Sequence, residues 1–300
     1  MRAADAPRVF SRERDLVPLV DLIGRLRAGP PGSSYLHPGG LQWLMRKTPD
    51  PEFAIHVWDD GDTMTGVVVI DGDYAMAHAD PARNDVLDLI AWSESDARRG
   101  GRSAVEISVW DDDTPLRAAV AARGYAPAGH FGPLLVWRMN GEPPAPSLPP
   151  GYRFVDFTAD MDDAYVEMHR DAWSVIRPSP YRRERHDRVT AMPQFERGMV
   201  PIVAAPDGTL AAYCIGWYDP VSRWTEIEPL GTRPAHAGRG LAHAVVREVI
   251  RRSWRRGADA VMVWATDPAS TVHVNEPARR LYESSAMRAE RVLREYRKAL

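Results

Sequence analysis

A glycine-rich segment between a predicted strand and a predicted helix limits the fold of this chain more than any other feature. Residues 224–232 alternate polar and apolar side chains, which indicates a strand. The segment TRPAHAGRGLA, from Thr232 to Ala242, follows and runs into a helical pattern. Glycines on both sides of an arginine let the backbone turn with exposed N–H groups, and the helix adds the positive end of its dipole. The combination predicts a pocket for a phosphate or a diphosphate.

The pattern of this loop differs from two common phosphate-binding motifs. No Gly-Lys-Ser/Thr ends it, so it is not a Walker loop, and His243 stands where the dinucleotide fingerprint has its third glycine. Apolar residues then recur at intervals of four, at Leu241, Val245 and Val249, and predict a helix that Gly257 can end.

A second motif follows about forty residues after the loop. Residues 275–284 read NEPARRLYES, and Asn275, Ala278, Leu281 and Tyr282 form the pattern N-x-x-A-x-x-L-Y. The order of strand, Thr-Arg-Pro turn, glycine loop, helix, strand and this motif resembles the GNAT superfamily of acetyl-CoA-dependent acyltransferases. The resemblance covers roughly residues 150–300.

Two positions depart from the family pattern. Ala237 stands where the family usually has Arg or Gln, and Ala286-Met287 stands where it usually has Gly-Phe. The first change removes a side chain but keeps the backbone N–H. We expect the second change to alter the packing beneath the last helix.

A proline-rich stretch at residues 141–151 divides the chain into two halves of similar outline, which predicts a doubled fold with a period of about 150 residues. In the first half, the Gly124-Tyr125 pair takes the place of Ala286-Met287. We expect one domain over residues 1–145 and another over 146–300. The resemblance implies that each is a GNAT-like α/β (α+β) domain, with a mostly antiparallel mixed sheet flanked by helices.

The two halves are not equivalent at the loop. The first half has DPARND at Asp80–Asp85, without a glycine and with added carboxylates that should repel a diphosphate. We therefore expect the first half to be a degenerate copy that binds no cofactor. Its role is then structural, or it walls the substrate cleft.

Composition excludes several classes of protein. A net charge of −3 argues against nucleic-acid binding, and no apolar run reaches the length of a membrane span. The start of the chain lacks the apolar core of a secretory signal, and a single cysteine, Cys214, excludes an intramolecular disulfide and a cysteine metal cluster. We expect a cytoplasmic monomer or homodimer without a metal, in which Cys214 is a buried strand residue.

The resemblance also implies which residues bind acetyl-CoA. The loop and the start of the helix would hold the diphosphate, the end of the strand would run beside the pantetheine arm, and Asn275 would cap its helix and contact the pantetheine. A backbone N–H, foremost that of Leu230, would polarise the acetyl carbonyl. The expected cofactor-binding residues are Leu230, Gly231, Thr232, Ala237, Gly238, Arg239, Gly240, Leu241, Ala242 and Asn275.

Three residues are candidates for catalysis. Glu226 matches the catalytic glutamate of some family members, and Glu228 projects from the same strand face, where two carboxylates would raise the proton affinity of one of them. Either could instead be a solvent-facing strand residue, and His236 is a third option for the base. Tyr282 matches the tyrosine that protonates the departing sulfur, and its alternative role is that of a core aromatic residue.

These residues predict an acetyl-CoA-dependent N-acetyltransferase. It would transfer the acetyl group to a primary amine of a small molecule, by direct attack in a ternary complex. Aromatic residues such as Trp173 and Tyr181, with a loop at residues 35–39 reaching in from the first half, suit an amine with an apolar body. Acetylation of a peptide or protein is an alternative. A non-catalytic acyl-CoA sensor is another, because Ala237 and the degenerate first half depart from the pattern.

Overall fold

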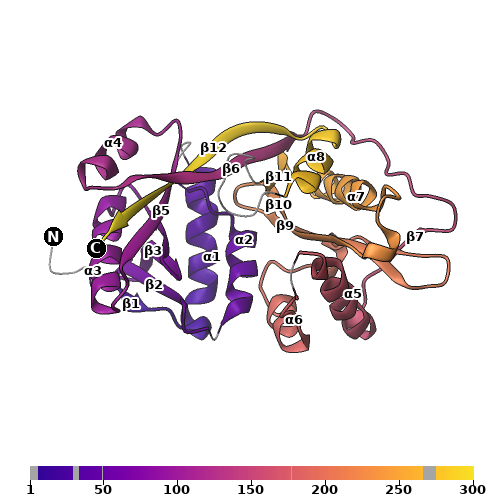
Figure 1. Ribbon diagram of the computed structural model, residues 1–300, viewed down its shortest axis with the longest axis horizontal. Helices are drawn as coiled ribbons and strands as arrows, with labels where there is room; N and C mark the ends of the chain where they lie inside the picture. Colours follow the sequence, from indigo (N-terminus) through magenta and orange to yellow (C-terminus); the bar gives the residue numbers. More distant parts are fainter. Residues whose placement is uncertain (1–5, 30–33, 49, 177, 266–274) are drawn as a thin grey trace.

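The computed structural model describes residues 6–29, 34–48, 50–176, 178–265 and 275–300, and these form a twelve-stranded mixed sheet with helices packed against it (Figure 1). The predicted α/β fold with a mixed sheet flanked by helices is confirmed. Figure 1 shows the two halves side by side, with the long strands β6 and β12 running together from one half to the other.

The same succession of strands and helices occurs twice. The first half consists of β1 (Arg8–Val9), α1 (Arg12–Ala28), α2 (Pro38–Leu44), the 3-10 helix η1 (Met45–Lys47), β2 (Phe53–Asp60), β3 (Thr63–Asp71), β4 (Tyr74–Ala79), α3 (Val86–Arg99), β5 (Ala104–Trp110), α4 (Thr114–Ala122) and β6 (Ala126–Arg138). The second half consists of β7 (Arg153–Val155), η2 (Ala159–Met161), α5 (Asp162–Ser174), α6 (Arg183–Thr190), η3 (Arg197–Met199), β8 (Ile202–Ala204), β9 (Leu210–Asp219), β10 (Trp224–Thr232), η4 (Pro234–His236), α7 (Leu241–Arg255), β11 (Ala260–Trp264), α8 (Glu276–Ser284) and β12 (Arg288–Ala299). Each element from β1 to β6 has a counterpart from β7 to β12, so the internal repeat is confirmed.

The sheet order shows that the halves exchange their last strands. The order is β1-β2-β3-β4-β5-β12-β6-β11-β10-β9-β8-β7. The strand β12 lies between β5 and β6 of the first half, and β6 in turn pairs with β11 of the second half. Both exchanged strands are long, which lets each of them reach the sheet of the opposite half.

Ion pairs fasten β12 to the first half. The ammonium of Lys298 lies 2.7 Å from a carboxylate oxygen of Glu94, which is buried on α3. Arg291 pairs with Asp112, and the chain of β12 also contributes the buried Leu293 to a small core between the two halves. The last strand therefore contributes to the packing of both halves.

The repeat extends to the turns that end α4 and α8. The N–H groups of Gly124 and Tyr125 donate to the carbonyls of Ala121 and Val120 at 3.0 and 3.1 Å, which is a Schellman motif. On α8 the N–H groups of the Ala286-Met287 pair donate to Glu283 and Tyr282 at 3.0 and 3.1 Å. Gly124 has a φ of +89° and Ala286 a φ of +66°, so an alanine occupies the left-handed position that glycine takes in the first half.

The largest apolar core joins the two halves. It contains Leu22 and Trp43 from the first half, and Tyr213 and Trp217 from the second half. Cys214, on β9, is fully buried as predicted. Among the described residues, no helix is long and apolar enough to cross a membrane.

The segment predicted as a loop at residues 35–39 begins a helix. The ring of His37 caps α2 by accepting a hydrogen bond from the N–H of Gly39, and Pro38 occupies the first helical position. The glycines at the start of α2 let it pack closely, since a Cβ on Gly39 would lie 2.1 Å from the Cβ of Trp217. The first half thus inserts a short helix against β9 and β10.

Candidate active site

The glycine loop leaves several backbone N–H groups open. Gly238 and Gly240 have φ values of +74° and +78°, in the left-handed region, and Gly240 caps α7 without a side chain. The N–H groups of Gly238, Arg239 and Gly240 have no hydrogen-bond acceptor among the residues that the structure describes. The first turn of α7 adds N–H groups with no acceptor inside the helix. This exposed group of donors suits a diphosphate.

The strand that precedes the loop separates from its neighbour. The strands β10 and β11 are parallel and pair from Trp224 to Glu226, opposite Ala260 to Met262. A shift of register with β9 then occurs between Ile227 and Leu230. The final residues of β10, including Leu230 and Thr232, therefore do not pair with β11.

Gly231 is explained by packing within the protein. A Cβ at this position would lie 2.7 Å from the ring of Tyr213 and 2.9 Å from the Cβ of Ala172. These two side chains are sufficient to require glycine at this position. The hydroxyl of Thr232, next along the chain, is buried without a hydrogen-bond partner among the described residues.

The motif at residues 275–284 forms α8 as predicted. The side chain of Asn275 caps the helix by accepting a hydrogen bond from the N–H of Ala278 at 3.2 Å. Tyr282, one of the candidates for catalysis, is buried on this helix. Burial, and next the neighbouring Cys214 and Glu228, raise the pKa of Tyr282, so its hydroxyl keeps its proton near neutral pH. No hydrogen bond from another described side chain or backbone group contributes to this shift in the pKa of the Tyr282 hydroxyl.

Glu226 is enclosed by the first half. Its side chain is only 5% exposed, and Oε2 lies 3.4 Å from Nδ1 of His37. A Cβ added to Gly40 would lie 2.6 Å from the same oxygen. The guanidinium of Arg27, on α1, also interacts with this carboxylate. Helices α1 and α2 therefore cover Glu226.

Glu228 is partly exposed and has a perturbed affinity for protons. Burial, followed by the charge of Glu226, raises the pKa of Glu228 to about 7, while Arg46 and the indole of Trp43 act in the opposite direction. The indole N–H of Trp217 donates to the backbone carbonyl of Glu228 at 2.6 Å and so fixes the strand at this point. A carboxylate that exchanges its proton near neutral pH is suited to act as a general base.

The sequence predicted that residues 35–39 reach in from the first half, but it did not single out Gly40, Trp43 and Arg46. His37 caps α2, Gly40 and Trp43 lie on α2, and Arg46 lies on η1. Each of them contacts one of the two glutamates or influences its charge. The signal for a helix was available, since a histidine followed by proline can cap and open one. The contacts of Gly40, Trp43 and Arg46 with the glutamates of the second half could not be predicted from the pattern.

The remaining candidate for the base is held away from this group. Nδ1 of His236 lies 3.0 Å from the hydroxyl of Tyr152, with which it shares a hydrogen bond. His236 belongs to η4, just before the glycine loop. It interacts with neither Glu226 nor Glu228 in the described part of the chain.

Comparison with known proteins identifies a family for part of the chain and a fold for the whole of it. A sequence profile described as the acetyltransferase (GNAT) family matches residues 163–286. A GCN5-related N-acetyltransferase from Sphaerobacter thermophilus has a TM-score of 0.59 at 20% identity, covering 100% of this chain and 96% of that chain. A tandem GNAT protein from the clavulanic acid biosynthesis pathway has a TM-score of 0.65 at 14% identity, covering 98% of both chains. A GNAT-family acetyltransferase from Colwellia psychrerythraea has a TM-score of 0.61 at 11% identity, covering 98% and 99%. No curated protein matches the sequence significantly.

At such low identities the solved structures show a shared fold, and the sequence profile adds the class of protein. The fold and the profile together define an acyltransferase. Residues 163–286 belong to the GNAT family of acetyltransferases, whose members use acetyl-CoA as the acyl donor, and the whole chain has the tandem GNAT fold. The resemblance expected from the motifs is confirmed.

Proposed function

We propose that the second half transfers the acetyl group of acetyl-CoA to a primary amine of a small molecule, by direct attack within a ternary complex. The observation that carries this proposal is Glu228, a carboxylate with a pKa near 7 on the strand that leads into the glycine loop. We further propose that the two repeats divide near residue 145, while their last strands are exchanged.

The residues of the second half fit acetyl-CoA. The open N–H groups from Gly238 to Ala242, with Ala237 at the edge of the loop, would hold the diphosphate, and Leu230 to Thr232 would lie along the pantetheine arm. Asn275 would add a contact at the start of α8. When bound, acetyl-CoA supplies an activated acetyl thioester.

Glu228 is the better base of the two glutamates. An amine arrives protonated near neutral pH and must lose a proton before it attacks, so the base must reach it. Glu226 is covered by Gly40 and His37, whereas Glu228 keeps some exposure. We assign proton acceptance to Glu228. Glu226 then influences the reaction indirectly, because its charge raises the pKa of Glu228.

The leaving group and the carbonyl need donors of their own. Tyr282 keeps its proton, so it can donate to the departing sulfur. The N–H of Leu230, on the part of β10 that does not pair with β11, would polarise the acetyl carbonyl. One such donor is worth about 3 kcal/mol of transition-state stabilisation.

Trp43, His169 and Tyr181 are buried in the core at the junction of the halves, so the proposal of a small acceptor with an apolar body draws on the partly exposed Trp173 beside them. The ring of Trp43 lies 5.9 Å from that of His169 and 5.8 Å from that of Tyr181. Trp173 stacks on the same histidine and donates its indole N–H to Tyr213. The packing of α2 against the second half beside Glu228 is our further reason for proposing a small acceptor over a protein chain.

The test is release of free coenzyme A thiol from purified full-length protein with acetyl-CoA and a panel of primary amines and lysine peptides. Turnover with small amines that is lost in Tyr282→Phe and Glu228→Gln supports the proposal. Turnover confined to peptides supports the alternative acceptor. Binding of acetyl-CoA without turnover on any acceptor would support the sensor and overturn catalysis.

A further inference from the structure

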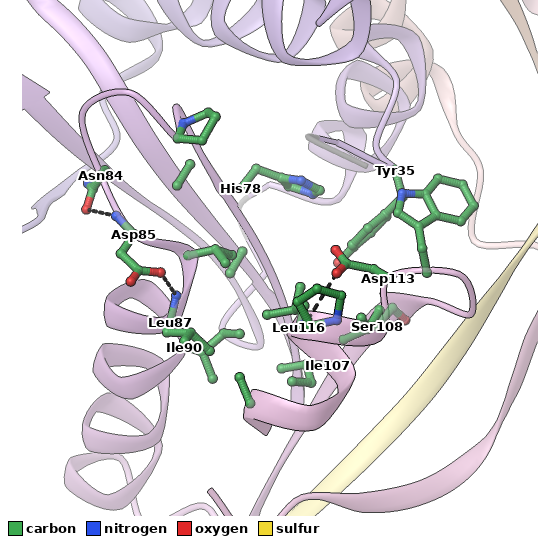
Figure 2. Close-up of a pocket in the computed structure, with 18 of the residues that line it drawn as sticks. Tyr35, His78, Asn84, Asp85, Leu87, Ile90, Ile107, Ser108, Asp113 and Leu116 are labelled. Carbon is green, nitrogen blue, oxygen red and sulfur yellow. Dashed lines mark hydrogen bonds between the residues drawn. The ribbon is translucent and has the colours of Figure 1, made fainter. Parts of the chain in front are cut away.

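The first half contains a large cavity of its own. Its volume is about 830 Å³, and it lies between β4, β5 and the starts of α3 and α4 (Figure 2). A volume of this size accommodates a ligand of several rings. The cavity is distinct from the residues around Glu228, none of which lines it.

The cavity exists because β4 and β5 separate. These parallel strands pair only where Tyr74 lies opposite Glu106 and then diverge. In the repeat, β10 and β11 are their counterparts and diverge after Glu226. The first half has therefore kept the open strands of the fold although its loop has changed.

The wall of the cavity is mainly apolar. Alanines of β4, aliphatic residues of α3 and β5, and Leu116 and Ala119 of α4 supply most of it. His78 and Tyr35 lie against each other on the wall, with ring centroids 4.5 Å apart (Figure 2). His78 is 2% exposed, and its Nε2 has no hydrogen-bond partner in the described part of the chain. The unpartnered nitrogen is itself buried, so the surface that the cavity presents on this side is apolar.

The charges on the lining disfavour an anion. Asp85 lines the cavity, and its carboxylate already accepts the N–H of Leu87 at 2.9 Å, so the helix end that would bind a phosphate is occupied (Figure 2). Asp113 is a second acidic group on the lining. Arg83 is the cation among the lining residues, and it pairs with Asp60 at 3.2 Å.

We propose that this cavity is a second ligand site, which takes an uncharged, mainly apolar molecule and does not take coenzyme A. The shape of the cleft is retained from the repeat, while its carboxylates exclude the diphosphate. The site is independent of acetyl transfer, so its occupancy does not require the function proposed for the second half.

Two probes that differ by one charged group test the proposal on the full-length protein. N-phenyl-1-naphthylamine is uncharged, and 1-anilinonaphthalene-8-sulfonate is its anionic analogue. We expect the uncharged probe to bind at least tenfold more tightly in a fluorescence titration, and we expect saturating acetyl-CoA to leave it bound. Equal affinity for both probes, or displacement by acetyl-CoA, would overturn the proposal.

Substitutions at two neighbouring alanines show whether the probe binds in the cavity. Ala119 lines the cavity, whereas Ala118 is exposed on the same helix and does not. Ala119→Phe should weaken binding of the uncharged probe at least tenfold, and Ala118→Phe should leave it unchanged. If both variants bind as the wild type does, the probe lies elsewhere and the proposal fails.

The role of charge has its own variant. Asp85→Asn keeps a side chain that can cap α3 but removes the negative charge. Binding of the anionic probe should strengthen severalfold, with no change for the uncharged probe. An anionic probe that is indifferent to this substitution would contradict the exclusion of anions by the lining.

Discussion

Nδ1 of His37, from the first half, lies 3.4 Å from Oε2 of Glu226, from the second half. The same nitrogen accepts the N–H of Gly39 at 3.0 Å, and Nε2 lies 3.3 Å from the carbonyl of Trp224. A neutral ring with its hydrogen on Nε2 satisfies both of these hydrogen bonds. His37 thus joins the cap of α2 to the strand that carries both glutamates.

The capping role of His37 can be separated from its bulk. His37→Ala removes the acceptor for Gly39 and should cost about 1 kcal/mol of unfolding free energy, whereas His37→Asn keeps a good capping side chain and should lose less. Urea denaturation of the two variants and of the wild type measures the difference. Equal stability of the two variants would show that the cap contributes nothing.

The pH dependence of turnover should report Glu228. A base must be deprotonated to act, so kcat/KM should rise with pH through an apparent pKa of about 7 and then level. Glu228→Gln should remove this rise and reduce kcat at least a hundredfold. An unchanged profile in this variant would remove Glu228 from the mechanism.

Glu228→Gln should lower activity but raise the stability of the folded protein. The pKa of Glu228 is raised on folding from 4.5 to about 7, so the wild type is relatively destabilised as the pH rises through this window. At pH 8 the unfolding free energy of Glu228→Gln should therefore exceed that of the wild type, by on the order of a few kcal/mol at most, and at pH 4 the two should be equal, as measured by urea denaturation. This comparison also shows that lost activity is not lost folding.

Two neighbours should move the pH profile in opposite directions. Arg46 lowers the pKa of Glu228 and Glu226 raises it. Arg46→Met should shift the rise of kcat/KM to higher pH, and Glu226→Gln should shift it to lower pH. Shifts of the same sign in both variants would show that the profile reports another group.

The glycine loop can be tested with isosteric side chains. A Cβ at Gly240 would contact nothing within 4 Å, and its φ of +78° is one that asparagine and aspartate tolerate better than other residues. Gly240→Asp should weaken acetyl-CoA binding at least tenfold more than Gly240→Asn, which corresponds to about 1.4 kcal/mol. Calorimetry measures both. Equal affinities would mean that no phosphate lies near this residue.

The left-handed alanine at the end of α8 limits stability. Ala286→Gly should raise the unfolding free energy by about 1 kcal/mol, since alanine carries a penalty at positive φ that glycine does not. Gly124→Ala, at the matching position of the first half, should lower it by a similar amount. Urea denaturation provides the measurement. A destabilised Ala286→Gly would indicate that the alanine methyl group contributes packing.

Local patterns were sufficient to predict much of the second half. Three features of the second half are determined by residues close together in the sequence, so a window of about ten residues is enough to predict each of them. They are the alternation in β10, the glycines before α7 and the Asn-Glu-Pro start of α8. The same holds for the internal repeat, because each half carries the same order of patterns.

The rest depended on contacts between distant segments. The preference for Glu228 over Glu226 follows from the covering helix with His37 and Gly40, and from Arg46 and Trp43 beside Glu228. The exchange of β6 and β12 was not predictable either, because a strand of alternating pattern pairs equally well with the fifth strand of its own half. Only the complete sheet distinguishes the two pairings.

The strands β6 and β12 each complete the sheet of the opposite half. The two halves are therefore held together by strand pairing as well as by the proline-rich connector at residues 141–151. A single protease nick within it should leave the two pieces associated through main-chain hydrogen bonds, and they should separate only under denaturing conditions. Neither piece could be inherited, recombined or engineered as a free-standing module without redesigning its final strand.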